Sequence, residues 1–125
     1  MNNRAFNNLI QFDDLQKLED DQYNLPFSIN RESKVFDGHF PNQAILPGVV
    51  MIEITKRALE MALGSELILE SAGNFKFLKL VDPNVMKNAM LDFTIAIKED
   101  AWRVKAQLIF MNEIYFKADA IYKRK

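Results

Sequence analysis

A histidine and a carboxylate lie fourteen residues apart, the first within a segment rich in glycine and proline and the second just after it. Two of the four glycines and two of the four prolines lie in residues 38–48, and His39, the only histidine, is near the start of that segment. Glu53 interrupts the apolar residues 49–54. A neutral imidazole can act as a general base near pH 7, and burial favours the protonated form of a carboxyl group, which can then act as an acid. His39 and Glu53 are therefore candidates for the base and the acid of a proton transfer.

Gly48 provides a third candidate group, a backbone N–H at the start of a helix. Pro47 is well placed near the beginning of a helix, and Gly64 is well placed to end it after Leu63. The first N–H groups of a helix have no partner within the helix, and glycine leaves its amide accessible. Such an amide can donate to a carbonyl oxygen that becomes negative during a reaction. Base, acid and donor together describe removal of a proton next to a thioester carbonyl with loss of a β-hydroxyl.

Each of the three candidates also has a purely structural interpretation. His39 could be an ordinary loop histidine, and Gly48 could serve only a tight turn. Glu53 could be a carboxylate paired at helical spacing with Lys56 or Arg57. If Arg57 pairs with it, the guanidinium would keep the carboxylate ionised and weaken it as a proton donor.

The elements that must position these groups are one helix and several strands. Apolar and polar residues alternate over 91–98, 102–110 and 114–123, and polar turns separate the three runs. This pattern predicts an antiparallel meander. Shorter strands are expected over 11–19, 23–30, 66–70 and 74–80, with Gly73 marking a turn or bulge. Two expected strands before the helix and the others after it indicate an α+β fold in which a sheet wraps around one buried helix. Five aromatic residues of the meander are expected to pack in the core or an interface: Phe93, Trp102, Phe110, Phe116 and Tyr122.

Composition narrows the class of protein. A chain of 125 residues fits a single domain, residues 1–125. The absence of cysteine excludes disulfides and thiolate chemistry, and one histidine excludes a two-histidine metal site within the chain, so neither metal nor cofactor is expected. A net charge of −1 gives no case for a nucleic-acid partner. No apolar run is long enough for a membrane span or typical of a signal peptide, so a soluble cytoplasmic protein is expected.

The motif residues resemble the active-site signature of the FabZ/FabA-like 3-hydroxyacyl-[acyl-carrier-protein] dehydratases. The resemblance rests on residues 38–41 (Gly-His-Phe-Pro), residues 47–49 (Pro-Gly-Val) and Glu53, with weaker similarity over residues 75–83. It implies a hot-dog fold, with His39 and Glu53 as the catalytic pair. It also implies substrate contacts from Gly48, Phe40 and Val49.

The resemblance further implies conversion of a (3R)-hydroxyacyl thioester to the trans-2-enoyl thioester, in fatty acid or polyene/polyketide-type synthesis. The substrate would be carried on the phosphopantetheine of an acyl carrier protein. Each site of a homodimer would take its histidine and its acid from different subunits. The chain departs from the family pattern at Asn42, Ala44 and Arg57, where Gly, Pro and Gln are usual. Two alternatives remain open, an inactive accessory subunit of the same fold and a hot-dog acyl thioesterase.

Overall fold

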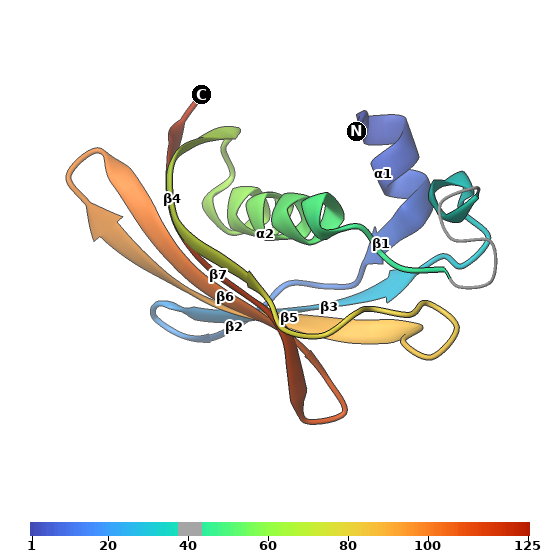
Figure 1. Cartoon of the computed structure of the whole chain (residues 1–125). Coiled ribbons are helices and arrows are strands. Elements are labelled where there is room, and N and C mark those ends of the chain that lie inside the picture. Colours follow the sequence, from blue (N-terminus) through green and yellow to red (C-terminus); the bar gives the residue numbers. More distant parts are fainter. Residues whose placement is uncertain (38–43) are drawn as a thin grey trace.

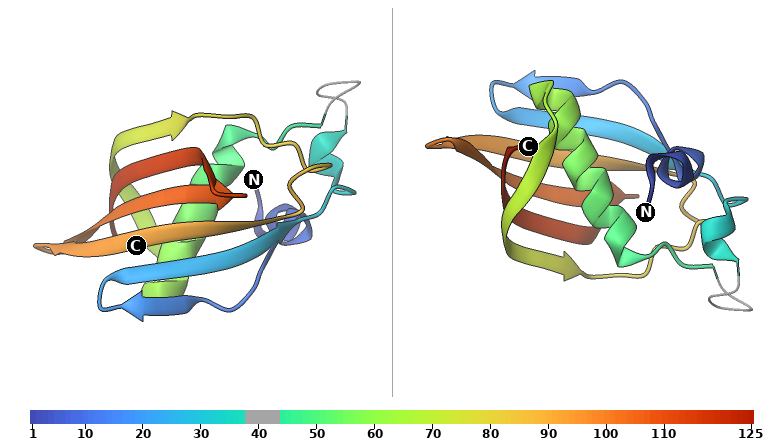
Figure 2. Two further views of the ribbon diagram at one scale, coloured as in Figure 1. Left: turned by 90° about the horizontal axis from the view of Figure 1, so that it is seen from below. Right: turned by 90° about the horizontal axis from the view of Figure 1, so that it is seen from above.

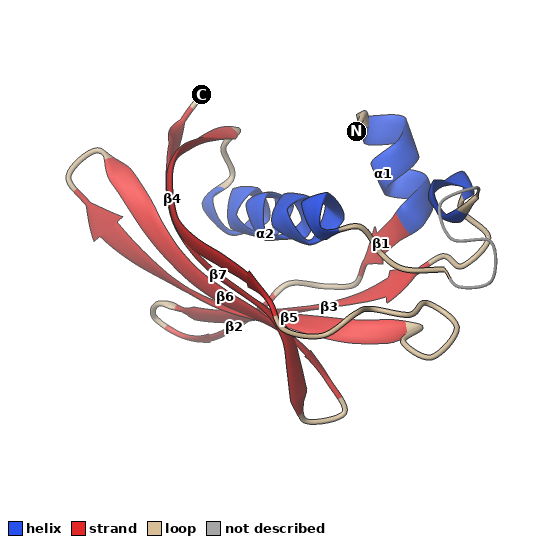
Figure 3. Cartoon of the chain, viewed as in Figure 1, coloured by secondary structure: helices blue, strands red, loops and turns tan. Residues whose placement is uncertain are grey.

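A curved antiparallel sheet wraps around one long helix in the computed structural model, which describes residues 1–37 and 44–125 (Figure 1, Figure 3). The elements in chain order are α1 (Asn3–Leu9), β1 (Ile10–Phe12), β2 (Gln16–Glu19), β3 (Gln22–Ile29), the 3-10 helix η1 (Lys34–Phe36), α2 (Gly48–Leu63), β4 (Leu67–Phe77), β5 (Asn88–Lys98), β6 (Ala101–Phe110) and β7 (Glu113–Arg124). The described strands form one seven-stranded sheet in the order β1-β3-β5-β6-β7-β4, with β2 also paired to β3. The predicted α+β architecture is confirmed.

The long helix α2 forms where its flanking residues predict it. Pro47 is its N-cap, and Gly64 ends it in the left-handed conformation with φ +67°. The side chains that α2 buries recur at helical spacing, namely Val50, Met51, Ile54, Thr55, Ala58 and Leu59. The helix lies in the concave side of the sheet, as the two views of Figure 2 show. The buried face of α2 therefore fixes the position of the helix, and with it Gly48 and Glu53, relative to the sheet.

The predicted meander is present as β5, β6 and β7. Leu91 pairs with Leu108, and Leu108 pairs with Phe116, so one apolar row crosses all three strands. Five of the residues that β5 and β7 bury beneath α2 are Leu91, Phe93, Phe116, Ala118 and Tyr122. Ile97, predicted for the same face as Leu91, is 81% exposed because it lies at the far end of β5, near the β5–β6 turn.

Strand β4 is one continuous edge strand rather than the two strands expected from Gly73. It follows β7 with two register shifts, one between Leu69 and Ser71 and one between Ala72 and Asn74. Gly73 thus lies at a bulge and ends no strand. A side chain there would meet the backbone oxygen of Asp119 at 3.0 Å, so the close approach of β7 explains the glycine.

Helix α1 was not expected from the sequence. The side chain of Asn2 accepts a hydrogen bond from the N–H of Ala5 and caps the helix. Phe6 and Leu9, three residues apart, are both fully buried. With seven residues the helix is too short to show a clear period, and it depends on this packing.

Within residues 1–37 and 44–125, no helix is both long and apolar enough to cross a membrane.

Candidate active site

The N-terminus of α2 is open, and an aromatic ring lies close beside it. Pro47 provides no side-chain cap, so no side chain of the described chain caps the first N–H groups. A Cβ placed on Gly48 would lie 2.8 Å from Cε1 of Phe77, at the end of β4. The Phe77 ring packs in turn on Phe116, with 5.1 Å between ring centroids. Gly48 therefore lets an amide at the positive end of the helix dipole lie directly beside an aromatic wall.

Glu53 is paired with Arg57 one turn further along α2. Nε of Arg57 donates to Oε1 of Glu53 at 2.8 Å. The Glu53 side chain is 28% exposed and that of Arg57 is 20% exposed. Burial of Glu53 is thus partial rather than the full burial expected from its apolar neighbours, because the carboxylate lies at the margin of the helix face that packs on the sheet. The pairing anticipated from the four-residue spacing is present.

The same guanidinium also contacts helix α1. Nη2 of Arg57 donates to Oδ1 of Asn3 at 2.6 Å. Cζ of Arg57 lies 4.4 Å from the centre of the Phe6 ring, a cation–π distance. Sequence reasoning missed Asn3 and Phe6, because their role depends on how α1 docks against α2.

Two further polar groups near the helix are Glu60, in the second half of α2, and Tyr122 of β7. Oε2 of Glu60 accepts a hydrogen bond of 2.8 Å from the N–H of Leu67 and so ties α2 to the start of β4. The Tyr122 hydroxyl is buried and has no hydrogen-bond partner in the described chain. Burial raises the pKa of Tyr122 to about 12, and the charges of Glu53 and Glu60 add to the effect. The sequence places Tyr122 among packing aromatics and gives no sign of this isolated hydroxyl.

Of the five predicted site residues, the structure places three on the first two turns of α2. Gly48 is the first residue of the helix, and Val49, Glu53 and Arg57 follow one another at four-residue spacing on one face. Val49 is 63% exposed, so this face of α2 is open to solvent at Val49 and leads to the Glu53 carboxylate, which is paired with Arg57. His39 and Phe40 lie outside the described residues, and their roles stay predictions.

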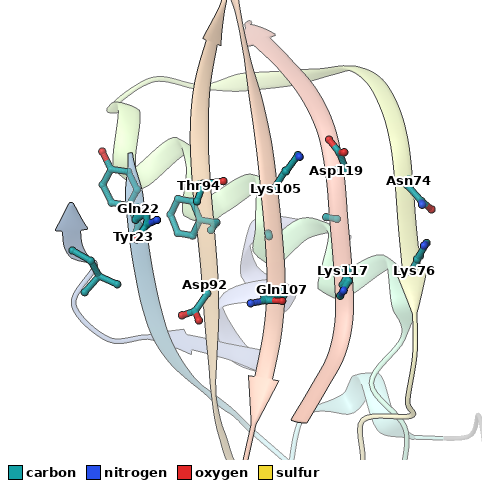
Figure 4. A pocket seen from close by; sticks show the side chains of 14 residues that line it. Gln22, Tyr23, Asn74, Lys76, Asp92, Thr94, Lys105, Gln107, Lys117 and Asp119 are labelled. Carbon is teal, nitrogen blue, oxygen red and sulfur yellow. The ribbon is translucent and has the colours of Figure 1, made fainter. Parts of the chain in front are cut away.

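A separate hollow of about 500 Å³ lies on the opposite face of the sheet (Figure 4). Its polar side chains alternate along the strands with residues that pack beneath α2; among them are Asn74, Lys76, Asp92, Thr94, Lys105 and Lys117. Burial raises the pKa of Asp92, and its Oδ1 has no hydrogen-bond partner among the described residues. The sheet separates this hollow from Gly48 and Glu53, so it is not part of the candidate active site.

Comparison with solved structures confirms the hot-dog fold. The chain superposes on "The Dehydratase Heterocomplex ApeI:P" from Xenorhabdus doucetiae with a TM-score of 0.72 and 17% identity, covering 91% of this chain and 97% of the other. It also superposes on the putative thioesterase yhdA from Lactococcus lactis with a TM-score of 0.69 and 14% identity, covering 99% and 97% of the two chains. At these identities the likeness shows the fold alone.

Sequence comparison shows the family. The chain is 32% identical over 97 residues to the 3-hydroxyacyl-[acyl-carrier-protein] dehydratase FabZ of Chlamydia pneumoniae, covering 65% of this chain and 62% of that relative. The match thus spans less than two thirds of the relative's length. The model of the ApeI-like family, described as ApeI dehydratase, matches residues 15–114, which is most of the chain. The chain therefore belongs to the ApeI-like dehydratase family.

Proposed function

We propose that this protein dehydrates a (3R)-hydroxyacyl thioester, carried by an acyl carrier protein, to the trans-2-enoyl thioester. The observation that carries the proposal is the pair of groups on α2, a partly buried Glu53 and an uncapped N-terminus at Gly48, in a chain of a dehydratase family. We expect this activity in the cytoplasm, in fatty acid or polyene/polyketide-type synthesis.

In the proposed reaction, each of the three protein groups acts on a different atom of the substrate. His39 removes the proton from C2, and the N–H of Gly48 donates to the thioester oxygen as it becomes negative. Glu53 gives a proton to the departing β-hydroxyl, so the products are water and the enoyl thioester. His39 then holds the C2 proton and Glu53 is a carboxylate. Both residues return to their starting protonation states once a proton passes from the imidazole of His39 to the carboxylate of Glu53.

The ion pair with Arg57 favours the carboxylate form of Glu53 and so weakens it as a proton donor, but it leaves one carboxylate oxygen open to the substrate. The guanidinium bonds to Oε1, and the other oxygen accepts no hydrogen bond from the described residues, so it remains available to a hydroxyl group. A guanidinium stabilises a carboxylate, which is the form that Glu53 takes after it has protonated the leaving group. In the reverse direction, hydration, the same carboxylate would accept the proton of the attacking water.

The free edge of β4 supports the proposed homodimer. Among the described strands β4 pairs only with β7, and its other edge is open. Apolar side chains are exposed along and just beyond it, namely Ile68, Leu69, Phe77, Leu78 and Leu80. An open edge with exposed apolar residues favours pairing with a second chain. A dimer through β4 would bring a second subunit close to Phe77 and Gly48, as a site shared between subunits requires.

A direct assay tests the proposal. The purified protein is incubated with 3-hydroxyacyl thioesters of acyl carrier protein and of pantetheine, and both enoyl absorbance and free thiol are followed. We expect enoyl formation, and a loss of about 10²- to 10⁴-fold in His39→Ala and in Glu53→Gln. Glu60→Gln is the matched control, because it makes the same change two turns along α2 and can still accept the hydrogen bond from Leu67.

Three outcomes would decide against the proposal. Thiol release without enoyl formation would indicate a thioesterase. Activity that appears only with a second, related subunit would indicate an accessory role. A Glu53→Gln variant as active as Glu60→Gln would remove Glu53 from the mechanism.

A further inference from the structure

Helix α1 contacts Arg57, the side chain that is paired with Glu53. Figures 1 and 2 show α1 beside α2, on the side of the sheet where α2 lies. Arg57 donates a hydrogen bond to Glu53 through Nε and to Asn3 through Nη2, and its Cζ lies over the ring of Phe6. Phe6 is fully buried, and its ring lies 5.9 Å from that of Phe12 of β1.

These three contacts restrict the guanidinium in different ways. A guanidinium is a rigid planar group with several N–H donors. Hydrogen bonds from two of its nitrogens therefore restrict rotation of the whole group. The Phe6 ring adds a cation–π contact that limits movement of the guanidinium away from α1. An isolated surface pair between residues four apart contributes little, because both side chains remain free to move. The Arg57 side chain has less of that freedom, because it is only 20% exposed and donates hydrogen bonds from both Nε and Nη2.

We propose that α1 is a positioning element of the active site, in which Asn3 and Phe6 hold Arg57 so that it fixes the orientation of the Glu53 carboxylate. The inference rests on the proposed role of Glu53 as the acid. None of the three residues Asn3, Phe6 and Arg57 touches a reacting atom, and they act only by orienting Glu53. A carboxylate turned by even a small amount would deliver its proton less well, while binding of the acyl thioester would change little.

The test compares two asparagines of the same helix. Asn3→Ala removes the hydrogen bond to Nη2 of Arg57, whereas Asn7→Ala makes the same change at an exposed position for which the structure shows no such bond. Both positions accept alanine, the best helix former, so α1 should persist in both. We expect kcat to fall about three- to tenfold in Asn3→Ala with KM nearly unchanged, and Asn7→Ala to match the wild type.

A double variant shows whether the effect passes through Arg57. In an Arg57→Gln background the side chain no longer reaches both partners, so Asn3→Ala should have no further effect on kcat. The Nε–Hε signal of Arg57 in NMR spectra provides a readout that needs no activity. It should shift in Asn3→Ala and in Glu53→Gln and stay unchanged in Asn7→Ala.

The outcomes separate this inference from the proposed function. A wild-type kcat together with an unshifted Arg57 signal in Asn3→Ala would overturn the role of α1. An equal loss of kcat from Asn3→Ala with and without Arg57 would also overturn it, because the helix would then act by another route. An inactive wild-type protein would overturn the proposed function, and the Arg57 signal would still decide whether Asn3 holds the guanidinium.

Discussion

The ring of Phe77 lies against the position that a side chain on Gly48 would occupy. A Cβ on Gly48 would be 2.8 Å from Cε1 and 3.0 Å from Cζ of that ring, which is closer than carbon atoms pack. The edge strand β4 thus brings an aromatic residue, 50% exposed, to the first residue of α2. The contact explains why a helix that begins with an open amide begins with glycine.

Gly48→Ala should fold but lose activity. Alanine gains roughly 1 kcal/mol of helix propensity, while displacing the Phe77 ring costs about 1 to 3 kcal/mol, so the free energy of unfolding should fall by no more than about 2 kcal/mol in urea titrations. The new methyl group lies next to the amide proposed to bind the thioester oxygen, so we expect kcat/KM to fall at least about tenfold.

A second substitution separates crowding at the amide from displacement of the ring. In the double variant Gly48→Ala, Phe77→Leu, the smaller leucine leaves room for the new methyl group. This variant should recover much of the lost free energy of unfolding, while its activity stays low. Recovery of full activity in this double variant would show that the amide of Gly48 tolerates a neighbouring methyl group and would argue against its proposed role.

The sequence predicted α2 well because its signals are local. Pro47 and Gly64 act on their own backbone, and the apolar spacing between them needs no partner to be interpreted. The pairing of Arg57 with Glu53 is likewise a matter of four-residue spacing on one helix. Features that depend on contacts between distant segments could not be predicted from local signals of this kind. Gly73 was expected to mark a turn or a bulge, and only the pairing of β4 with β7 shows that it lies at a bulge within one strand.

The contacts around Arg57 show the same limit at the candidate site. Asn3 and Arg57 are 54 residues apart, and nothing near either residue in the sequence indicates that they bond. Phe6 lies in a segment for which the sequence predicted no helix or strand, although it is fully buried. Long-range docking of a short helix therefore decided which residues surround Glu53, and a local pattern cannot predict it.

The buried hydroxyl of Tyr122 leads to a prediction about stability at high pH. The folded pKa of Tyr122 is about 12, above the value of about 10 expected for tyrosine in an unfolded chain. Between these values the unfolded chain loses the proton and the folded chain keeps it, so stability falls as pH rises. The contribution is fully present below about pH 10 and is lost by about pH 12, by roughly 3 kcal/mol.

Tyr122→Phe should remove this dependence on pH. Because the hydroxyl has no hydrogen-bond partner in the described chain, its loss should leave the free energy of unfolding at pH 7 unchanged or raise it by about 1 kcal/mol. Urea titrations from pH 8 to pH 11 would measure both effects, with Tyr23→Phe, at a partly buried ring stacked on Phe93, as the control. A clear loss of stability at pH 7 in Tyr122→Phe would show that the hydroxyl has a partner after all.

The exposed apolar side chains of β4 lead to a prediction about assembly. Leu69 lies on this edge strand and is 40% exposed, although β4 pairs with β7 along its other side. If two copies pair through β4, Leu69→Lys places charges in the interface, where desolvation would be costly. We expect this variant to sediment as a monomer at concentrations where the wild type is a dimer, and to lose dehydratase activity because each site would need both subunits. Ile97→Lys is the matched control, since Ile97 is 81% exposed at the end of β5, away from that edge. If Leu69→Lys remains a dimer, or if both variants dissociate alike, β4 is not the interface and the second subunit must approach α2 from another side.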